Sequence, residues 1–162
     1  MTHGKRLPQR KGLFFVMSST LAYGGLFSAA FLSATILPAQ SELGLAALVI
    51  SDNYSLAMLI FVASLGNSLG AVVNWGLGHW VRHFQDTKWA LPSPNHMKRA
   101  ASWYQRFGKW SLLLSWVPII GDPLTLLAGF MRLSLLPFLL FVIIAKTMRY
   151  VIVVALVRGF FS

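Results

Sequence analysis

Two long runs of this sequence carry no charged side chain, and they constrain the fold more than any other feature. The first extends from Gly12 to Ser41, and the second extends from Asn53 to Val81. A helix of about 20 apolar residues is long enough to cross the hydrocarbon core of a bilayer, and each run exceeds that length. Hydrophobic residues make up 56% of the 162 residues and charged residues only 11%. The sequence therefore predicts an all-α, multi-pass integral membrane protein.

The net charge of +10 is concentrated in two polar stretches beside these runs. Residues 1–11 carry +4 and residues 82–109 carry +5. Lys and Arg in short loops beside apolar spans mark the cytoplasmic side of a membrane protein. No nucleic-acid-binding motif accompanies the charge, and the absence of Cys excludes a disulfide-stapled scaffold. We expect membrane lipids as partners, leave a homo-oligomer open, and expect no nucleic acid.

Prolines and polar residues divide the chain into shorter elements. Helices are predicted over residues 13–37, 42–51, 55–81 and 133–157. Ser93 and Pro94 begin a basic amphipathic helix over 94–109 that suits a membrane surface, the alternative being a solvated connector. We divide one membrane domain, 1–162, into a basic leader (1–12), a first repeat with its N-terminal helix (13–81), a cytoplasmic loop with the amphipathic helix (82–109) and a second repeat (110–162).

The two halves of the chain form an internal repeat when one is laid on the other. The alignment that places Pro38 on Pro118 also places Glu42 on Asp122, and it lays the helix over 55–81 on residues 135–161. Proline interrupts helical hydrogen bonding, and irregular backbone at membrane depth survives where protein or a wet cavity satisfies it. We therefore expect each half to form a re-entrant helical hairpin, with Pro38 or Pro118 at its tip, followed by one transmembrane helix. One crossing per repeat makes the halves an inverted repeat, as in many secondary transporters.

Four ionisable residues lie at apolar depth in this arrangement. An unpaired Asp, Lys or Arg in the middle of a membrane helix costs about 2.5–3.5 kcal/mol on insertion scales. We expect Glu42 and Asp122 to pair with Lys146 and Arg149 around a hydrated cavity. Glu42 and Asp122 are candidates for proton or ion coupling, and Lys146 and Arg149 for binding an anionic head group. The alternative is a purely structural role, with acids at helix N-termini and cations that reach the interface.

The segment from Gly66 to Gly70 contains two overlapping patterns. As Gly-x-Ser-x-Gly it matches the nucleophile elbow of serine hydrolases, but that motif requires a strand-turn-helix, whereas this copy lies in an apolar helix. As Gly-x-x-x-Gly it allows close helix packing, and the repeat places Asn67 opposite Thr147 as polar lining. We expect no enzyme activity, no catalytic residue, no metal site and no cofactor.

Several segments of the chain, in this order and spacing, resemble the YqaA branch of the DedA superfamily, also called VTT or SNARE-associated Golgi proteins. The likeness covers about residues 27–159, and it is carried by residues 31–42, 66–70 with Gly78, 104–108, 115–122 and 146–150. The resemblance implies a bacterial inner-membrane protein with two opposed re-entrant hairpins. It also implies a role in moving lipids across the membrane, in some members with the proton-motive force.

The resemblance assigns a family role to some of the candidate residues but not to others. Essential acids near the first hairpin of the family correspond to Glu42. Typical members place arginines around the second proline, where this chain has Trp116 and Asp122. Lys146 and Arg149 therefore become the cationic candidates.

Taken together, these features predict a DedA-like transporter or flippase. It would couple protons or another ion to the translocation of an anionic lipid or similar amphiphile in envelope maintenance. The alternative is a membrane scaffold or assembly factor that does not transport and that contacts partners through Gly66, Gly70 and the amphipathic helix.

Overall fold

The computed structural model describes residues 9–34, 40–81, 108–117 and 121–161, and the regular elements of these residues are helices. The all-helical class is therefore confirmed. Both predicted hairpin tips, Pro38 and Pro118, lie outside the described residues, as do residues 1–8 and nearly all of the predicted amphipathic helix. The elements are α1 (Gln9–Ser33), α2 (Gln40–Ile50), α3 (Leu56–Val81), the 3₁₀ helix η2 (Gly108–Trp116), α5 (Gly121–Phe130) and α6 (Leu135–Phe161).

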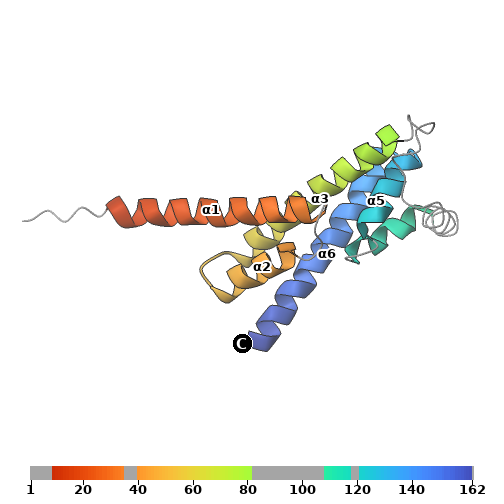
Figure 1. Ribbon diagram of the computed structural model, residues 1–162. Coiled ribbons are helices and arrows are strands. Elements are labelled where there is room, and N and C mark those ends of the chain that lie inside the picture. Colours follow the sequence, from red (N-terminus) through yellow and green to blue (C-terminus); the bar gives the residue numbers. More distant parts are fainter. Residues whose placement is uncertain (1–8, 35–39, 82–107, 118–120, 162) are drawn as a thin grey trace, which may run out of the picture.

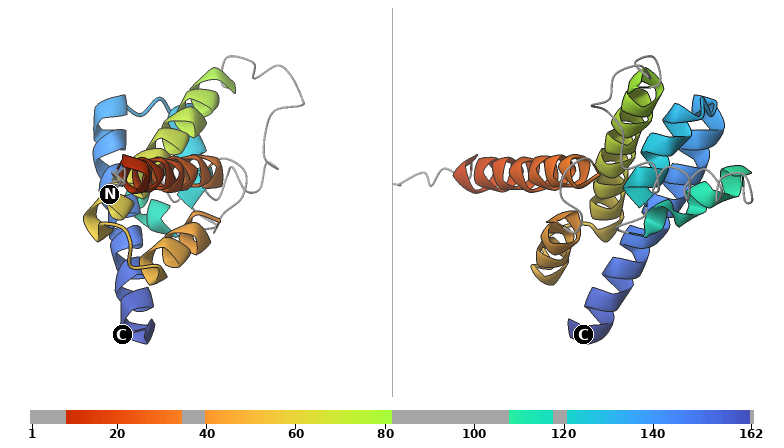
Figure 2. Two further views of the ribbon diagram at one scale, coloured as in Figure 1. Left: turned by 90° about the vertical axis from the view of Figure 1, so that its left-hand side faces the viewer. Right: turned by 45° about the vertical axis from the view of Figure 1, so that its right-hand side comes forward.

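Two of these helices, α3 and α6, are long and apolar enough to cross a membrane. They pack against each other and run in opposite directions (Figures 1 and 2). Their outward side chains remain exposed, as with Leu136 at 82% and Phe160 at 83%, which is the pattern of helices that face lipid. The prediction for α3 is confirmed, whereas α6 both begins and ends later than predicted. α6 starts after Ser134. The carbonyl of Ser134 accepts a hydrogen bond from the amide of Phe138, in the first turn of the helix, at 3.3 Å.

The two short helices cannot cross a bilayer on their own. With 11 and 10 residues, α2 and α5 are about 16 and 15 Å long, half of the roughly 30 Å core. The first helix, α1, ends at Ser33, earlier than the predicted end at residue 37. Proline disfavours the helical conformation of the residue before it, so a helix ending ahead of Pro38 is physically expected.

Each short helix packs on the long helix of the other half. α2 packs on α6 and α5 packs on α3, whereas α1 packs on α3 and η2 packs on α6. The views agree that α1 projects away from the other helices, and its described buried residues lie in its C-terminal part (Figures 1 and 2). Two apolar cores result along the seam between α3 and α6. One contains Leu26, Ala30, Leu45, Val49, Leu59, Ala63, Tyr150 and Val154, and the other contains Ala71, Leu112, Ala128, Phe138 and Val142.

The C-termini of α2 and α5 have the same backbone geometry. Asp52 and Arg132, which the repeat alignment places on each other, both adopt the left-handed conformation, with φ of 52° and 58°. The amide of Asp52 donates to the carbonyl of Val49 at 3.2 Å, and that of Arg132 donates to the carbonyl of Gly129 at 2.9 Å. Left-handed residues of this kind commonly end helices. The two short helices therefore end in the same way at repeat-related positions.

The starts of α3 and α6 align at a sequence offset that is one residue smaller than the offset that aligns the ends of α2 and α5. Ser55 and Ser134 precede α3 and α6, and the carbonyl of each accepts a hydrogen bond from the amide one helical turn later. The difference in register arises in the connections between the short and long helices. With the helix starts aligned, Asn67 corresponds to Lys146 rather than to Thr147.

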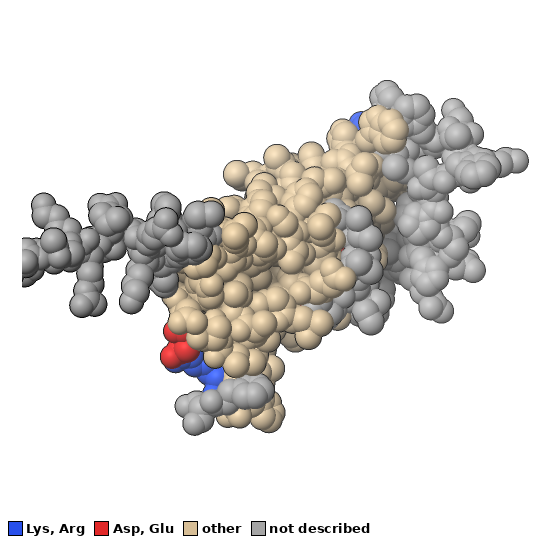
Figure 3. Space-filling view, turned by 60° about the vertical axis from the view of Figure 1, so that its left-hand side comes forward, with Lys and Arg blue, Asp and Glu red and all other residues tan. Residues whose placement is uncertain are grey.

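Charge is scarce on the surface of the described chain. On the face drawn in Figure 3, acidic and basic atoms gather in one small patch at the lower left, a single basic spot lies at the upper right, and the remaining described surface is neither acidic nor basic. The described residues include one exposed ion pair, Arg158 Nη2 to Asp52 Oδ1 at 2.9 Å, which joins the end of α6 to the α2–α3 connection. An uncharged surface of this kind suits contact with hydrocarbon.

Candidate functional site

One face of α6 carries two cations, and each cation pairs with an acid from a different short helix. Lys146 Nζ lies 3.1 Å from Asp122 Oδ1, and Arg149 Nε lies 2.5 Å from Glu42 Oε1. Residues i and i+3 of a helix share a face, so Lys146 and Arg149 project in the same direction. The four residues singled out in the sequence are therefore brought together.

The acids are held by the helices that they begin. Glu42 lies in the first turn of α2, and Asp122 lies in the first turn of α5. The positive end of the helix dipole stabilises a carboxylate at each position. Because α2 packs on α6 and α5 contacts η2 beside α6, both first turns approach the same stretch of α6. The acids thus have a structural reason for their place as well as an electrostatic one.

The two members of each ion pair are buried to different degrees. The side chains of Lys146 and Arg149 are 1% and 8% exposed, whereas those of Asp122 and Glu42 are 21% and 25% exposed. Taking an ion out of water costs several kcal/mol, which the attraction of a well-placed opposite charge offsets. The cations are therefore enclosed and the carboxylates form the accessible side of the site. This arrangement suits exchange of a proton or another cation at the carboxylates.

The cations have donors to spare. An ammonium has three N–H groups and a guanidinium has five. Among the described residues, Lys146 and Arg149 each make one side-chain hydrogen bond, to Asp122 and Glu42 respectively. The free N–H groups match the acceptor oxygens of a phosphate or carboxylate, with the guanidinium binding in two-pronged fashion.

A chain of buried hydrogen bonds supports the Arg149–Glu42 pair from behind. The hydroxyl of Tyr150 donates to Ser41 Oγ at 3.0 Å and accepts from Asn67 Nδ2 at 2.7 Å. Ser41 Oγ lies in turn 3.0 Å from Ser33 Oγ. Ser41 and Tyr150 are the immediate neighbours of Glu42 and Arg149, so the bond between them fixes the register of α2 on α6. The signals for them in the sequence are that adjacency and their place in two of the segments that resemble the family.

Asn74 performs a similar task at the end of α1. Its Nδ2 donates to the carbonyl of Ala34 at 2.7 Å and lies 3.4 Å from Thr125 Oγ1, which donates to the carbonyl of Asp122 at 2.7 Å. A carbonyl left free where a helix ends at membrane depth is costly unless a partner is supplied. Asn74 supplies that partner and ties the end of α1 to the first turn of α5. Sequence reasoning missed Asn74 and Thr125, because a single buried amide or hydroxyl has no pattern in the sequence.

Glycines bring the helices around the site into close contact. A Cβ on Gly66 would lie 2.6 Å from the carbonyl oxygen of Phe27, and one on Gly70 would lie 2.6 Å from that of Phe31. The Gly-x-x-x-Gly segment thus lies against α1. A second close approach, between α3 and α5, lies where a Cβ on Gly129 would meet the carbonyl of Trp75. Sequence reasoning did not single out Gly129, because the other glycine of α5, Gly121, does not stand at the four-residue spacing of a Gly-x-x-x-Gly pattern.

Two antiparallel helices long enough to cross a membrane, one of which carries buried cations paired with acids of the short helices, define a small helical membrane protein with a polar site in its interior. A family model, the VTT domain, matches residues 12–159, and the chain belongs to this family, which is part of the DedA superfamily. The resemblance found in the sequence is confirmed. No solved structure matches the chain.

Relatives with inner-membrane names cover most of the chain. It is 40% identical over 139 residues to the inner membrane proteins YqaA of Escherichia coli (strain K12) and of Shigella flexneri, which is 86% of this chain and 93% of each relative. An uncharacterized protein of Haemophilus influenzae is 36% identical over 137 residues, which is 78% of this chain and 81% of the relative. The chain is thus an integral protein of the bacterial inner membrane.

Proposed function

We propose that this protein is a transporter or flippase that moves an anionic lipid or similar amphiphile across the inner membrane, coupled to protons or another ion. The observation that carries the proposal is the pair of buried ion pairs, Lys146–Asp122 and Arg149–Glu42, on one face of a spanning helix. A structural protein gains little from buried ion pairs, because apolar residues of similar volume are often as stabilising. A site that must release and rebind charge needs them.

The proposed cycle follows from the limited number of partners for each cation. Lys146 and Arg149 bind either their own carboxylates or the anionic head group of a substrate. Protonation of Glu42 and Asp122, or their binding of another cation, removes the competing charge and frees the cations for the head group. Loss of those protons on the other side of the membrane restores the ion pairs and expels the substrate. The site remains close to neutral throughout, as a low-dielectric surrounding requires.

An inverted repeat of two re-entrant hairpins provides an architecture for this cycle. The like-ended short helices, the exchanged packing of α2 on α6 and α5 on α3, and the opposite directions of α3 and α6 support it. In this proposal α2 and α5 are the second arms of the hairpins, and 82–109 is the cytoplasmic link between the halves of one membrane domain. Repeats of this kind place the binding site at their interface, near the membrane midplane.

Packing speaks against the scaffold alternative for Gly66 and Gly70. Both glycines lie against α1 within the chain, so their surface is not free for another protein. Of the two hypotheses, transport is therefore the one that gives the two buried ion pairs a role.

A reconstituted translocation assay tests the proposal. Purified protein is placed in liposomes that contain a fluorescent anionic lipid, and a membrane-impermeant quencher reports the rate at which that lipid changes leaflet. We expect Glu42→Gln and Asp122→Asn to lower the protein-dependent rate at least about tenfold, since each leaves a cation permanently unpaired or paired with substrate. Asp52→Asn is the matched control, because this acid is 80% exposed and lies outside the site. Wild-type rates in both site variants would remove the acids from the mechanism.

A further inference from the structure

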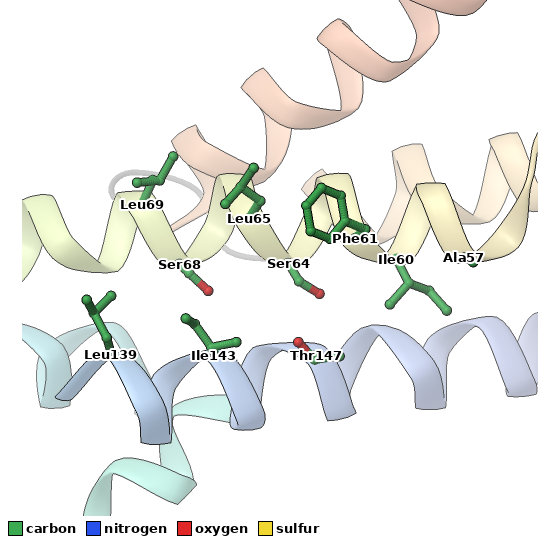
Figure 4. A pocket seen from close by; sticks show the side chains of 10 residues that line it. All are labelled: Ala57, Ile60, Phe61, Ser64, Leu65, Ser68, Leu69, Leu139, Ile143 and Thr147. Carbon is green, nitrogen blue, oxygen red and sulfur yellow. The ribbon is translucent and has the colours of Figure 1, made fainter. Parts of the chain in front are cut away.

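A groove with a volume of about 350 Å³ runs along the seam between α3 and α6 (Figure 4). Its walls are mostly aliphatic and aromatic side chains from both helices. Ser64 and Ser68 of α3 point toward the seam, and Thr147 of α6 points toward them from the other side. The volume lies in the range of small-molecule binding sites, which begin at about 300 Å³.

The two serines of the groove have unused hydrogen-bonding capacity. Ser64 and Ser68 are 6% and 3% exposed, and among the described residues neither hydroxyl has a hydrogen-bond partner. A serine in a membrane helix ordinarily satisfies its hydroxyl on the carbonyl one turn earlier. A buried hydroxyl that does not do so retains a donor for a ligand, and leaving it unmatched costs free energy.

The rim of the groove faces outward. Phe61, Leu65 and Ile143 line it and are 60%, 44% and 46% exposed. In a helix pair that spans a membrane, such side chains contact lipid tails. A molecule can therefore enter sideways from the bilayer without crossing water.

The depth of the serines limits what can satisfy them. Ser64 and Ser68 lie about 12 and 18 Å from the start of a helix that is about 39 Å long, given a rise of about 1.5 Å per residue. Hydrogen-bond partners from the solvent are scarce at that depth. A water molecule needs two to four polar partners close around it to remain in a cavity, and the three hydroxyls of this groove are spread along otherwise apolar walls. The occupant must be apolar in the main and must carry hydrogen-bond acceptors.

We propose that this groove is a binding site for an ester-linked acyl lipid. The hydrocarbon chain lies along the apolar walls, and the ester carbonyls accept hydrogen bonds from Ser64 and Ser68. Two serines one helical turn apart, separated by about 6 Å along the axis, match a lipid that carries two neighbouring ester groups. This site lies along the seam, and none of the four ion-pair residues lines it. Lipid is therefore bound there whether or not the protein transports.

Binding of matched ester and ether lipids tests the inference. Phosphatidylglycerol with two oleoyl esters and its dialkyl ether analogue differ in the carbonyl groups alone. Each lipid is titrated into the purified full-length protein in detergent, and native mass spectrometry counts the bound copies. We expect the wild type to retain the ester lipid about tenfold better, as two hydrogen bonds imply. The double variant Ser64→Ala and Ser68→Ala binds both lipids equally.

Controls separate the groove from the rest of the protein. Ser51→Ala removes an exposed serine that bonds within its own turn, to the carbonyl of Leu48 at 2.8 Å, and leaves the preference intact. Ile143→Trp fills the groove while keeping both serines, and lowers retention of both lipids. A wild type that retains the two lipids equally overturns the proposal, as does a wild-type homodimer that Ile143→Trp dissociates, since a second copy would then occupy the groove. Loss of the ester preference with transport unchanged separates this site from the proposed transport site.

Discussion

The charge of Lys146 is almost wholly buried, and the opposite charge of Asp122 offsets the free-energy cost of that burial. Replacing Lys146 by Met leaves Asp122 partly buried without a partner. We expect Lys146→Met to lower the free energy of unfolding by about 3 kcal/mol, in the range found when one member of a buried ion pair is removed. Adding Asp122→Asn to the same chain recovers most of that loss. Tryptophan-fluorescence melting of both variants measures the coupling.

Strictly additive losses in the double variant would contradict this account. They would show that Lys146 and Asp122 stabilise the protein through other contacts. Arg158→Met is the control, because its ion pair with Asp52 is exposed and exposed pairs contribute about 0–1 kcal/mol.

Tyr150 contributes a single hydroxyl to the site. Tyr150→Phe leaves Ser41 and Asn67 without this partner in a buried region, which we expect to cost about 1–3 kcal/mol of stability. Because α2 then loses its register on α6, the translocation rate falls even though Glu42 and Arg149 are intact. Tyr23→Phe is the matched control, since its ring packs edge-on against Tyr54 at 5.6 Å between centroids. Equal effects of the two substitutions would refute the role of Tyr150.

The sequence predicts which charged residues form the site, but it does not predict which acid pairs with which cation. Glu42, Asp122, Lys146 and Arg149 stand out because a charge at apolar depth is costly and needs an opposite charge. The pairing of each acid with its cation depends on how α2 and α5 pack, and no local sequence pattern predicts that packing. Tyr150 and Asn74 are polar groups whose burial is visible only once the helices are assembled.

At the scale of elements, close approaches between helix backbones hold the site together. The tightest joins α3 to α5, where Gly78 meets the carbonyl of Leu126 and Gly129 meets that of Trp75. Both obstacles are backbone atoms, which a side chain cannot displace without moving a helix. The α3–α5 contact thus sets where Asp122 lies.

Alanine at Gly129 tests this contact. Gly129→Ala forces α5 away from α3, and we expect a loss of about 1–3 kcal/mol, as for other overpacked cores. Gly76→Ala is the control on α3, because a Cβ there meets nothing within 4 Å. Alanine is the better helix former, so this variant remains as stable as the wild type or gains slightly. Melting temperatures that fall equally in the two variants would contradict the proposed contact.

Elements are predicted from the sequence to different degrees. The start and end of α3 follow from its uncharged run, and both are confirmed almost to the residue. The end of α1 and the start of α6 differ from prediction, because apolar residues continue past the places where capping hydrogen bonds end the helices. The sequence offset that aligns the starts of α3 and α6 differs from the one that aligns the ends of α2 and α5, because a connection lies between each short and long helix, and the hydrophobic pattern has no period there.

At the scale of the whole molecule, the ends of the helices fall into two groups. The Asp52–Arg158 pair joins the start of α3 to the end of α6. Trp75 Nε1 donates to the carbonyl of Leu133 at 3.1 Å, which joins the last part of α3 to the start of α6. We propose that the second group lies on the cytoplasmic side, because residues 82–109, which follow α3, carry a net positive charge.

Single cysteines in this cysteine-free chain test that topology. We expect Asn53→Cys and Gly159→Cys to react with a membrane-impermeant maleimide added to intact spheroplasts. Ser134→Cys reacts only after permeabilisation, because it lies at the opposite end of α6. Labelling of all three from one side would contradict antiparallel crossing by α3 and α6.

Lys146 and Arg149 are proposed to hold an anionic head group during translocation, and the selectivity of transport for that head group tests this role. Proteoliposomes are loaded with fluorescent phosphatidylglycerol or phosphatidylcholine that have the same chains, and the leaflet-exchange rates are compared for the wild type, Lys146→Gln and Arg149→Gln. We expect the wild type to move the anionic lipid at least about tenfold faster, and each substitution to abolish the preference. Equal rates for the two lipids in the wild type, or an unchanged preference in both variants, would contradict it.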